Sequence, residues 1–155
     1  MNDKFYVTDC EGPLSINDNA YEISDFFIPE GGHFFSILSN YDDMLVEENT
    51  EGYLAGSTLK LILPFFKAYG LTEKDLIEFS EDNIFMIDGA YNMIKYIQSI
   101  MPCYIVSTSY NQYIKALSDK TGFIYENTYS TNLQLDKYDL NQEEQDKLLD
   151  IHDNI

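Results

Sequence analysis

The sequence of 155 residues contains no arginine and no tryptophan, and its nine lysines are outnumbered by 27 aspartates and glutamates. The formal net charge is therefore -18 at pH 7. Because such a chain repels phosphate backbones and anionic lipid headgroups at long range, we expect neither nucleic acid nor a membrane surface as its partner.

Long apolar runs and cysteine are equally scarce. No stretch approaches the roughly 20 apolar residues that a membrane-spanning helix needs, and the amino terminus lacks the regions of a signal peptide. Cys10 and Cys103 make neither a disulfide framework nor a zinc site. On neighbouring parallel strands they would be offset by roughly 13 Å, too far for a disulfide. We therefore expect a cytoplasmic protein with two separate thiols.

An apolar fraction of 45%, with 13 Tyr and 10 Phe, is sufficient for a packed core despite the acidity. Residues 5–8 and 103–106 have the composition of short buried strands, and residues 123–125 predict a third. Segments with apolar residues at helical spacing lie between them. This alternation predicts an α/β fold with a parallel sheet.

Helix boundaries follow from capping and breaking residues. Capping-box spacing at Ser15 and Asp18, and again at Thr72 and Asp75, predicts two helix starts. Pro64 is expected to kink or restart the apolar helix around it. The expected helices span residues 15–27, 34–38, 57–69, 72–79, 90–100, 110–120 and 142–151, and residues 40–56 are expected to form a polar segment.

Reactive groups of parallel α/β sheets lie at the carboxyl ends of strands, and two such ends carry polar side chains here. Asp9 follows the first strand, and Glu11 and Gly12 come shortly after it. This arrangement suits an aspartyl nucleophile: Asp9 attacks a phosphoryl group, while Glu11 protonates the leaving oxygen and later activates water. Ser107 and Thr108 follow the second strand, where they could hold phosphoryl oxygens together with backbone N–H groups.

The segments FYVTDCEGPL and CYIVSTS resemble the first and second motifs of the haloacid dehalogenase-like (HAD) hydrolase superfamily. DCEGPLSINDNAYE with STSYNQYIKAL is further similar to an archaeal branch labelled as an energy-converting hydrogenase accessory subunit. The resemblance covers residues 4–16 and 84–131, the N-terminal part of the family's domain. It implies an incomplete HAD-like Rossmannoid parallel sheet. The implied organisation is a core of residues 1–16 and 84–135, a helical cap of residues 17–83 and an acidic helical tail of residues 136–155.

The same resemblance implies Mg²⁺-dependent phosphatase activity on a small phosphorylated metabolite, through an aspartyl phosphate on Asp9. The carboxylate of Asp9 and the backbone carbonyl of Glu11 would then bind Mg²⁺. The family usually has Asp where this chain has Glu11. The family's lysine and its later acidic motif are not found, since no candidate lysine precedes an apolar strand ending in paired acids. The candidates are Lys115, Lys120, Lys137 and Lys147. The Mg²⁺ site is therefore expected to be weak or incomplete.

A second reading is a non-enzymatic interaction or assembly module on the same fold, because two motifs are missing and no arginine is present to grip phosphate. In the superfamily another strand pairs with the first one. If that segment is missing, residues 5–8 form an exposed sheet edge. We expect the acidic tail or a second copy of the chain, in a homodimer, to cover that edge.

Structural roles compete with functional ones at several residues. Asp9 could be a turn residue, and residues 107–109 could also cap a helix. His33, beside two phenylalanines, is either a cap residue that reaches substrate or a packed or exposed side chain. Residues 41–43 (YDD) form either a metal or substrate site in the cap or a solvated acidic loop.

Overall fold

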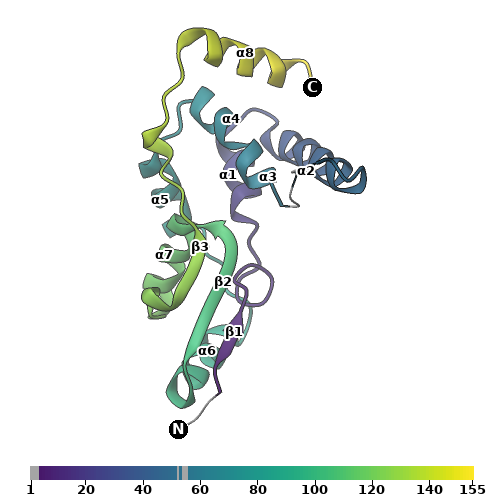
Figure 1. The fold of residues 1–155 in the computed structure, drawn as a ribbon. Coiled ribbons are helices and arrows are strands. Elements are labelled where there is room, and N and C mark those ends of the chain that lie inside the picture. Colours follow the sequence, from purple (N-terminus) through teal and green to yellow (C-terminus); the bar gives the residue numbers. More distant parts are fainter. Residues whose placement is uncertain (1–3, 52, 54–55) are drawn as a thin grey trace. The chain divides into compact units, whose positions relative to one another are not determined.

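The computed structural model describes residues 4–51, 53 and 56–155, and its contacts divide the chain into two units, each built from two segments (Figure 1). The first unit comprises Met1–Asn19 and Leu76–Leu133, and the second comprises Ala20–Asp75 and Gln134–Ile155. Residues 76–83, which the sequence reading placed in a cap, make their contacts within the first unit, and the C-terminal tail belongs to the second.

The first unit contains a three-stranded parallel sheet in the order β1-β2-β3. The strands are β1 (Tyr6–Thr8), β2 (Cys103–Tyr110) and β3 (Thr128–Thr131). The two strands expected near residues 5–8 and 103–106 are present, although β2 continues through the hydroxyl-bearing residues to Tyr110. The third strand was expected at residues 123–125 and lies further along the chain, because Phe123 is buried in the core and Tyr125–Asn127 forms a 3₁₀ turn.

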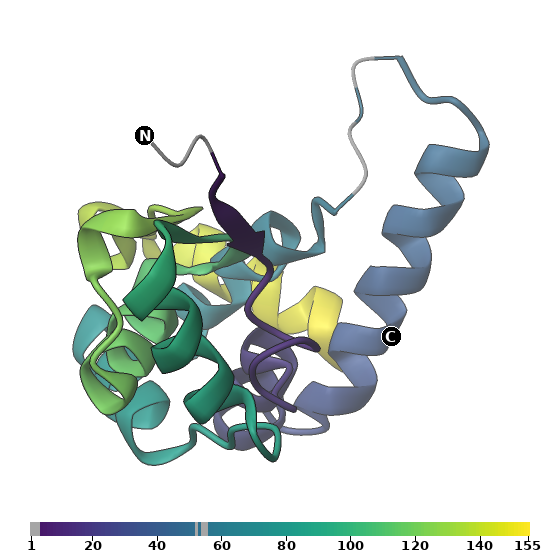
Figure 2. The same cartoon turned by 90° about the horizontal axis from the view of Figure 1, so that it is seen from below.

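Two helices cover one face of this sheet: α6 (Ala90–Ile100) and α7 (Asn111–Thr121). Figures 1 and 2 show both helices on the same side of the strands. The core between them contains Ile94 of α6, Leu117 of α7 and Ile105 of β2, all at most 1% exposed. Burial of these aliphatic side chains contributes roughly 2 kcal/mol each, which fixes the strand ends that carry the candidate site.

The second unit is helical. Its elements are α1 (Asn19–Phe27, which starts at the last residue of the first unit), α2 (Gly31–Glu47), α3 (Thr58–Leu61), α4 (Leu63–Ala68) and α8 (Gln142–Asp153). The helix break expected at Pro64 is confirmed, since α4 begins beside that proline. Helix α2 is longer than predicted: it runs through the acidic residues after Asn40 because its exposed face accommodates them.

Helix α5 (Glu73–Asp82) begins at the capping box that the sequence predicted. Thr72 Oγ1 accepts the N–H of Asp75 at 3.3 Å, and Asp75 Oδ2 accepts the N–H of Thr72 at 2.8 Å. The capping box expected at Ser15 is wrong: α1 starts only at Asn19, and Ser15 is fully buried in a tertiary hydrogen bond. Among residues 4–51, 53 and 56–155, no helix has the length and apolar character needed to cross a bilayer.

Candidate functional site

Asp9 lies immediately after β1, at the carboxyl end of the strand. Its side chain is exposed, and Oδ1 accepts the N–H of Cys10 at 2.6 Å. Thr8 pairs with Ile105 in the parallel register, so Ser107 lies two residues beyond that pair on the neighbouring strand. The fold therefore places Asp9 close to Ser107 on the adjacent strand, although Ser107 lies within β2 and not past its end as the sequence predicted.

Glu11 lies in a tight turn that follows Asp9. Gly12 adopts φ +97°, a conformation that favours glycine, and its N–H donates to the Ser15 carbonyl at 2.8 Å. The half-buried Glu11 side chain reaches the start of α1, where Oε1 accepts the N–H of Asn19 at 2.7 Å. A backbone donor thus orients this carboxylate, and the additional methylene of Glu is used to span that distance.

Ser107 and Thr108 lie within β2 and not beyond its end. Ser107 Oγ is 3.0 Å from Ser109 Oγ, and it accepts the N–H of Ser109 at 3.3 Å. The register with β3 shifts between Val106 and Tyr110, which is typical of a bulge. The hydroxyl run does not cap α7, because the residue at that position is Tyr110 and no side chain caps the helix.

A buried polar network supports the turn after Asp9. The hydroxyl of Tyr113 donates to Ser15 Oγ at 2.7 Å and lies 3.1 Å from Asn17 Oδ1. Asn17 Nδ2 donates to the carbonyl of Asn83 at 2.7 Å, and Asn17 Oδ1 accepts the N–H of Phe85 at 2.9 Å. Sequence reasoning missed these residues, since no local pattern distinguishes Tyr113 from the other core residues of its helix.

Cys10, between Asp9 and Glu11, is not available as a nucleophile. Its side chain is fully buried, and burial, followed by the charge of Glu11, raises the pKa of the thiol to about 12. The thiolate is therefore scarce at neutral pH. Cys103 is also buried, and both cysteines are free, which confirms that they form no disulfide.

The side chains near Asp9 provide few of the ligands that a metal ion would need. In the part of the chain that the structure describes, no three His, Cys, Asp or Glu side chains come together as a possible metal site. Asp9 supplies one carboxylate, whereas Mg²⁺ is usually held by one or two carboxylates together with water and substrate. The residues present thus fit a weakly held ion and not a complete protein cage.

Three of the four candidate lysines have partners of their own. Lys115 pairs with Asp119, four residues later in α7. Lys147 Nζ lies 2.8 Å from Oε1 of Glu143, four residues earlier in α8. Lys120 Nζ donates to the carbonyl of Ile84 at 2.8 Å. Lys137 lies in a short 3₁₀ helix of the second unit. None of these contacts marks one lysine as part of the site at Asp9.

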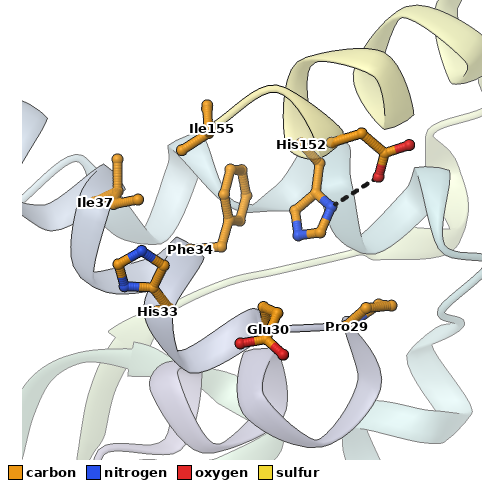
Figure 3. Close-up of a pocket in the computed structure, with 8 residues that line it drawn as sticks. Pro29, Glu30, His33, Phe34, Ile37, His152 and Ile155 are labelled. Atoms are coloured by element: carbon orange, nitrogen blue, oxygen red, sulfur yellow. Dashed lines mark ion pairs between the residues drawn. The ribbon is translucent and has the colours of Figure 1, made fainter.

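A pocket of about 320 Å³ in the second unit is lined by His33 and by His152, a second histidine that sequence reasoning left without a role (Figure 3). The side chain of His152 is 8% exposed, and its Nδ1 lies 2.8 Å from the hydroxyl oxygen of Tyr69. The ring of His152 packs edge to face against the ring of Phe34, with 4.7 Å between the ring centroids. The space suits a small molecule. His33 itself is exposed.

Asp42 is not part of a solvated acidic loop, because it lies within α2 and is only 4% exposed. Its Oδ2 accepts the N–H of Gly56 at 3.0 Å, the hydroxyl of Thr58 at 3.0 Å and the N–H of Thr58 at 3.3 Å. Burial alone would raise the pKa of this carboxyl, but the hydrogen bonds lower it below the ordinary value of 3.8. Asp42 therefore fastens the start of α3 to α2.

Asp42→Ala should lower the free energy of unfolding by about 2 kcal/mol, because buried donors lose their acceptor. Asp43→Ala, at an exposed neighbouring position, should change it by less than about 0.5 kcal/mol. The native pKa of Asp42 lies below 3.8, so its contribution is present above that pH and lost as pH falls through the native pKa. Urea unfolding of both variants between pH 7 and pH 2.5 measures this, and an Asp42 effect that persisted at the lowest pH would contradict it.

The fold and these contacts define a mixed α/β protein with a small parallel sheet and several helices. A solved structure, that of gene product AF1437 from Archaeoglobus fulgidus, is similar with a TM-score of 0.89 and 32% sequence identity. The match covers 96% of this chain and 47% of that chain, so this chain spans about half the length of that protein. No protein-family model matches the sequence, and no curated protein does.

Proposed function

We propose that this protein is a HAD-like phosphatase that hydrolyses a small phosphorylated metabolite through an aspartyl phosphate on Asp9. The single observation that carries the proposal is the position of Asp9, an exposed carboxylate at the end of β1, beside the hydroxyl-rich segment of the adjacent parallel strand. In open parallel sheets, ligands bind at the carboxyl ends of the strands.

Each residue of the site has a chemical role in this proposal. Asp9 attacks the phosphorus atom, the bond to the leaving oxygen breaks, and Glu11 supplies the proton that this oxygen takes up. Glu11 then accepts a proton from the water that hydrolyses the aspartyl phosphate, which releases phosphate and restores the Asp9 carboxylate and the protonated Glu11. Ser107 and Thr108 hold the phosphoryl oxygens by hydrogen bonds. Glu11 would have to exchange its contact with the N–H of Asn19 for one with substrate.

Mg²⁺ belongs to the proposal as the ion that neutralises the phosphoryl charge when bound. The carboxylate of Asp9 and the backbone carbonyl of Glu11 would hold it weakly in this chain. The substrate is expected to be a small metabolite, since nothing in the proposal calls for nucleic acid or a membrane.

A phosphate-release screen tests the proposal. The protein is incubated with a panel of small phosphorylated metabolites, in Mg²⁺ and in EDTA. Phosphate release that requires Mg²⁺, together with a thermal shift on adding beryllofluoride and Mg²⁺ as an aspartyl phosphate mimic, supports it. No release from any substrate and no thermal shift would remove the enzymatic reading.

The alternative is a non-enzymatic interaction or assembly module. The observation that favours it is the number of exposed apolar side chains on one face of the sheet, Phe5, Val7, Val106 and Tyr129, which are 47–64% exposed. Enzymes do not need such a face, whereas docking modules do. A protein without phosphate release that still binds a polypeptide through this face would fit the alternative.

A further inference from the structure

Another pocket, of about 290 Å³, lies in the second unit and is lined by residues from two segments that are distant in the sequence. Residues 60–67 line it from α3 and α4, and residues 135–140 line it from the chain that precedes α8. Most of the lining is apolar and includes Leu63, Leu135 and Tyr138. Leu135 is fully buried and Tyr138 is 64% exposed, so the apolar lining extends from the packed interior to the surface.

The charges that line this pocket are the reverse of those in the whole chain. Two lysines, Lys60 and Lys67, line it together with one acid, the exposed Asp139, whereas the chain has 27 acids for nine lysines. The two lysines are seven residues apart, and Ile62 between them keeps helical backbone angles, φ -74° and ψ -25°. Seven residues make two helical turns, so both lysines lie on one face of this helical stretch, about 10 Å apart along its axis.

The ammonium group of Lys67 lacks a hydrogen-bond acceptor among the residues that the structure describes. Its side chain is 18% exposed, and its ion pair with Asp136 Oδ1 is 4.0 Å long, beyond hydrogen-bond distance. That oxygen already accepts the N–H of Glu73 at 3.0 Å. Lys60 is exposed, and its Nζ has no ion pair or hydrogen bond within the same described part of the chain. A largely buried cation is stabilised when an anionic acceptor is supplied to it, so the pocket favours an anionic ligand.

We infer that this pocket binds a small amphiphilic carboxylate, a molecule with one carboxylate group and an apolar body. The carboxylate accepts hydrogen bonds from Lys67 Nζ, and the apolar body packs against Leu63, Leu135 and Tyr138. The exposed Lys60 attracts the anion to the pocket, which raises the rate of association more than the strength of the final contact.

The size and charge of the pocket narrow the class of ligand. A volume of about 290 Å³ is at the lower end of the range for small-molecule pockets, roughly 300–1,000 Å³, so the apolar body is short. A single negative charge is preferred to two, because Asp136, Asp139 and the net charge of -18 repel the second. This site lies in the second unit and does not depend on the chemistry proposed for Asp9 in the first.

Four probes with the same eight-carbon chain test the assignment: octanoate, octanol, octylammonium and octyl phosphate. Each is titrated into isotopically labelled residues 1–155, and the backbone amide signals are followed by nuclear magnetic resonance. Octanoate is expected to shift the amides of Leu135 and Tyr138 to saturation, and to bind at least about tenfold more tightly than octanol, because only the carboxylate engages the lysines. Octylammonium should bind more weakly than octanol, and octyl phosphate more weakly than octanoate.

Lys67→Gln should weaken octanoate binding by about tenfold or more, since it removes the hydrogen-bonded cation. Lys60→Gln should weaken it by about threefold at low salt, and this difference should vanish in high salt because an exposed charge is screened. Melting temperatures show whether the variants fold. Lys60 is exposed and has no side-chain partner among the described residues, so Lys60→Gln tests the inference even if Lys67→Gln destabilises the unit.

Lys147→Gln is the matched control, because it removes the same charge from the same unit outside the pocket. Lys147 lies on α8, its side chain is 70% exposed, and it pairs with Glu143. This variant should bind octanoate within about twofold of the unchanged protein. Octanol that bound as tightly as octanoate, octyl phosphate that bound more tightly, equal weakening in all three lysine variants, or amide shifts confined to residues away from the pocket would overturn the inference.

Discussion

Asp9→Asn is expected to abolish Mg²⁺-dependent phosphate release by this protein, with a loss of at least about a thousandfold, because the amide cannot form an acyl phosphate. The fold should be unaffected. Asp9 is exposed, and its Oδ1 accepts the N–H of Cys10, a hydrogen bond that an amide oxygen accepts equally well. The thermal shift on adding beryllofluoride and Mg²⁺ should disappear together with the activity.

Asp18→Asn is the matched control, since Asp18 is an exposed aspartate in the same loop and has no role in the proposed chemistry. It should retain phosphate release within about twofold. The measurement is the initial rate of phosphate release on the best substrate of the screen, with circular dichroism to verify folding. Turnover that survived in Asp9→Asn, or that fell equally in both variants, would show that Asp9 is not the nucleophile.

Gly31→Ala is expected to produce the largest loss of stability in the second unit. A Cβ atom at Gly31 would lie 1.8 Å from the carbonyl oxygen of Ser24 and 2.5 Å from its carbonyl carbon. These are backbone atoms of α1, so the contact can be relieved only by moving α2 away from α1. The N–H of Gly31 also donates to the carbonyl of Ile28 at 3.0 Å, which holds the turn tight. We expect a loss of about 3 kcal/mol or more.

Gly70→Ala separates this steric effect from the general cost of replacing a glycine. Gly70 has φ +78° and no atom within 4 Å of a built Cβ, so alanine there experiences backbone strain alone, about 1 kcal/mol. Urea unfolding followed by circular dichroism and tyrosine fluorescence measures both, since the chain has no tryptophan. Equal losses in the two variants would mean that the α1–α2 approach is looser than described.

Strand β2 and the position of Asp9 could be predicted because each depends on a local pattern, a short apolar run ending in polar residues. Phe123 could not be placed in the same way, since a few apolar residues suit a buried turn as well as a strand, and here the 3₁₀ turn that follows moves β3 further along the chain. The length of α2 was missed for a different reason. Its acidic residues suggested a loop, whereas most of them lie on the exposed side of a continuing helix, with Asp42 buried.

In the candidate site, too, the residues with a local sequence pattern could be predicted and the long-range contacts could not. Asp9, Glu11 and Ser107 carry local sequence signals, and the parallel pairing of β1 with β2 places Asp9 close to Ser107. The contacts that set their geometry are long-range and have no local signal: Tyr113 with Ser15, and Glu11 with Asn19. The role of His152 in a pocket with His33 arises only because the second unit is made from distant segments.

The way in which the chain alternates between the two units has a consequence for its biosynthesis. The polypeptide passes from one unit to the other after Asn19, after Asp75 and after Leu133. During translation, the N-terminal strand therefore has no parallel neighbour until residues 103–110 have left the ribosome, and the helices of the second unit wait for residues 134–155. Neither unit can complete its contacts early, so the nascent chain exposes apolar segments for most of its synthesis. Its strong negative charge would then keep the unfinished chains apart by mutual repulsion.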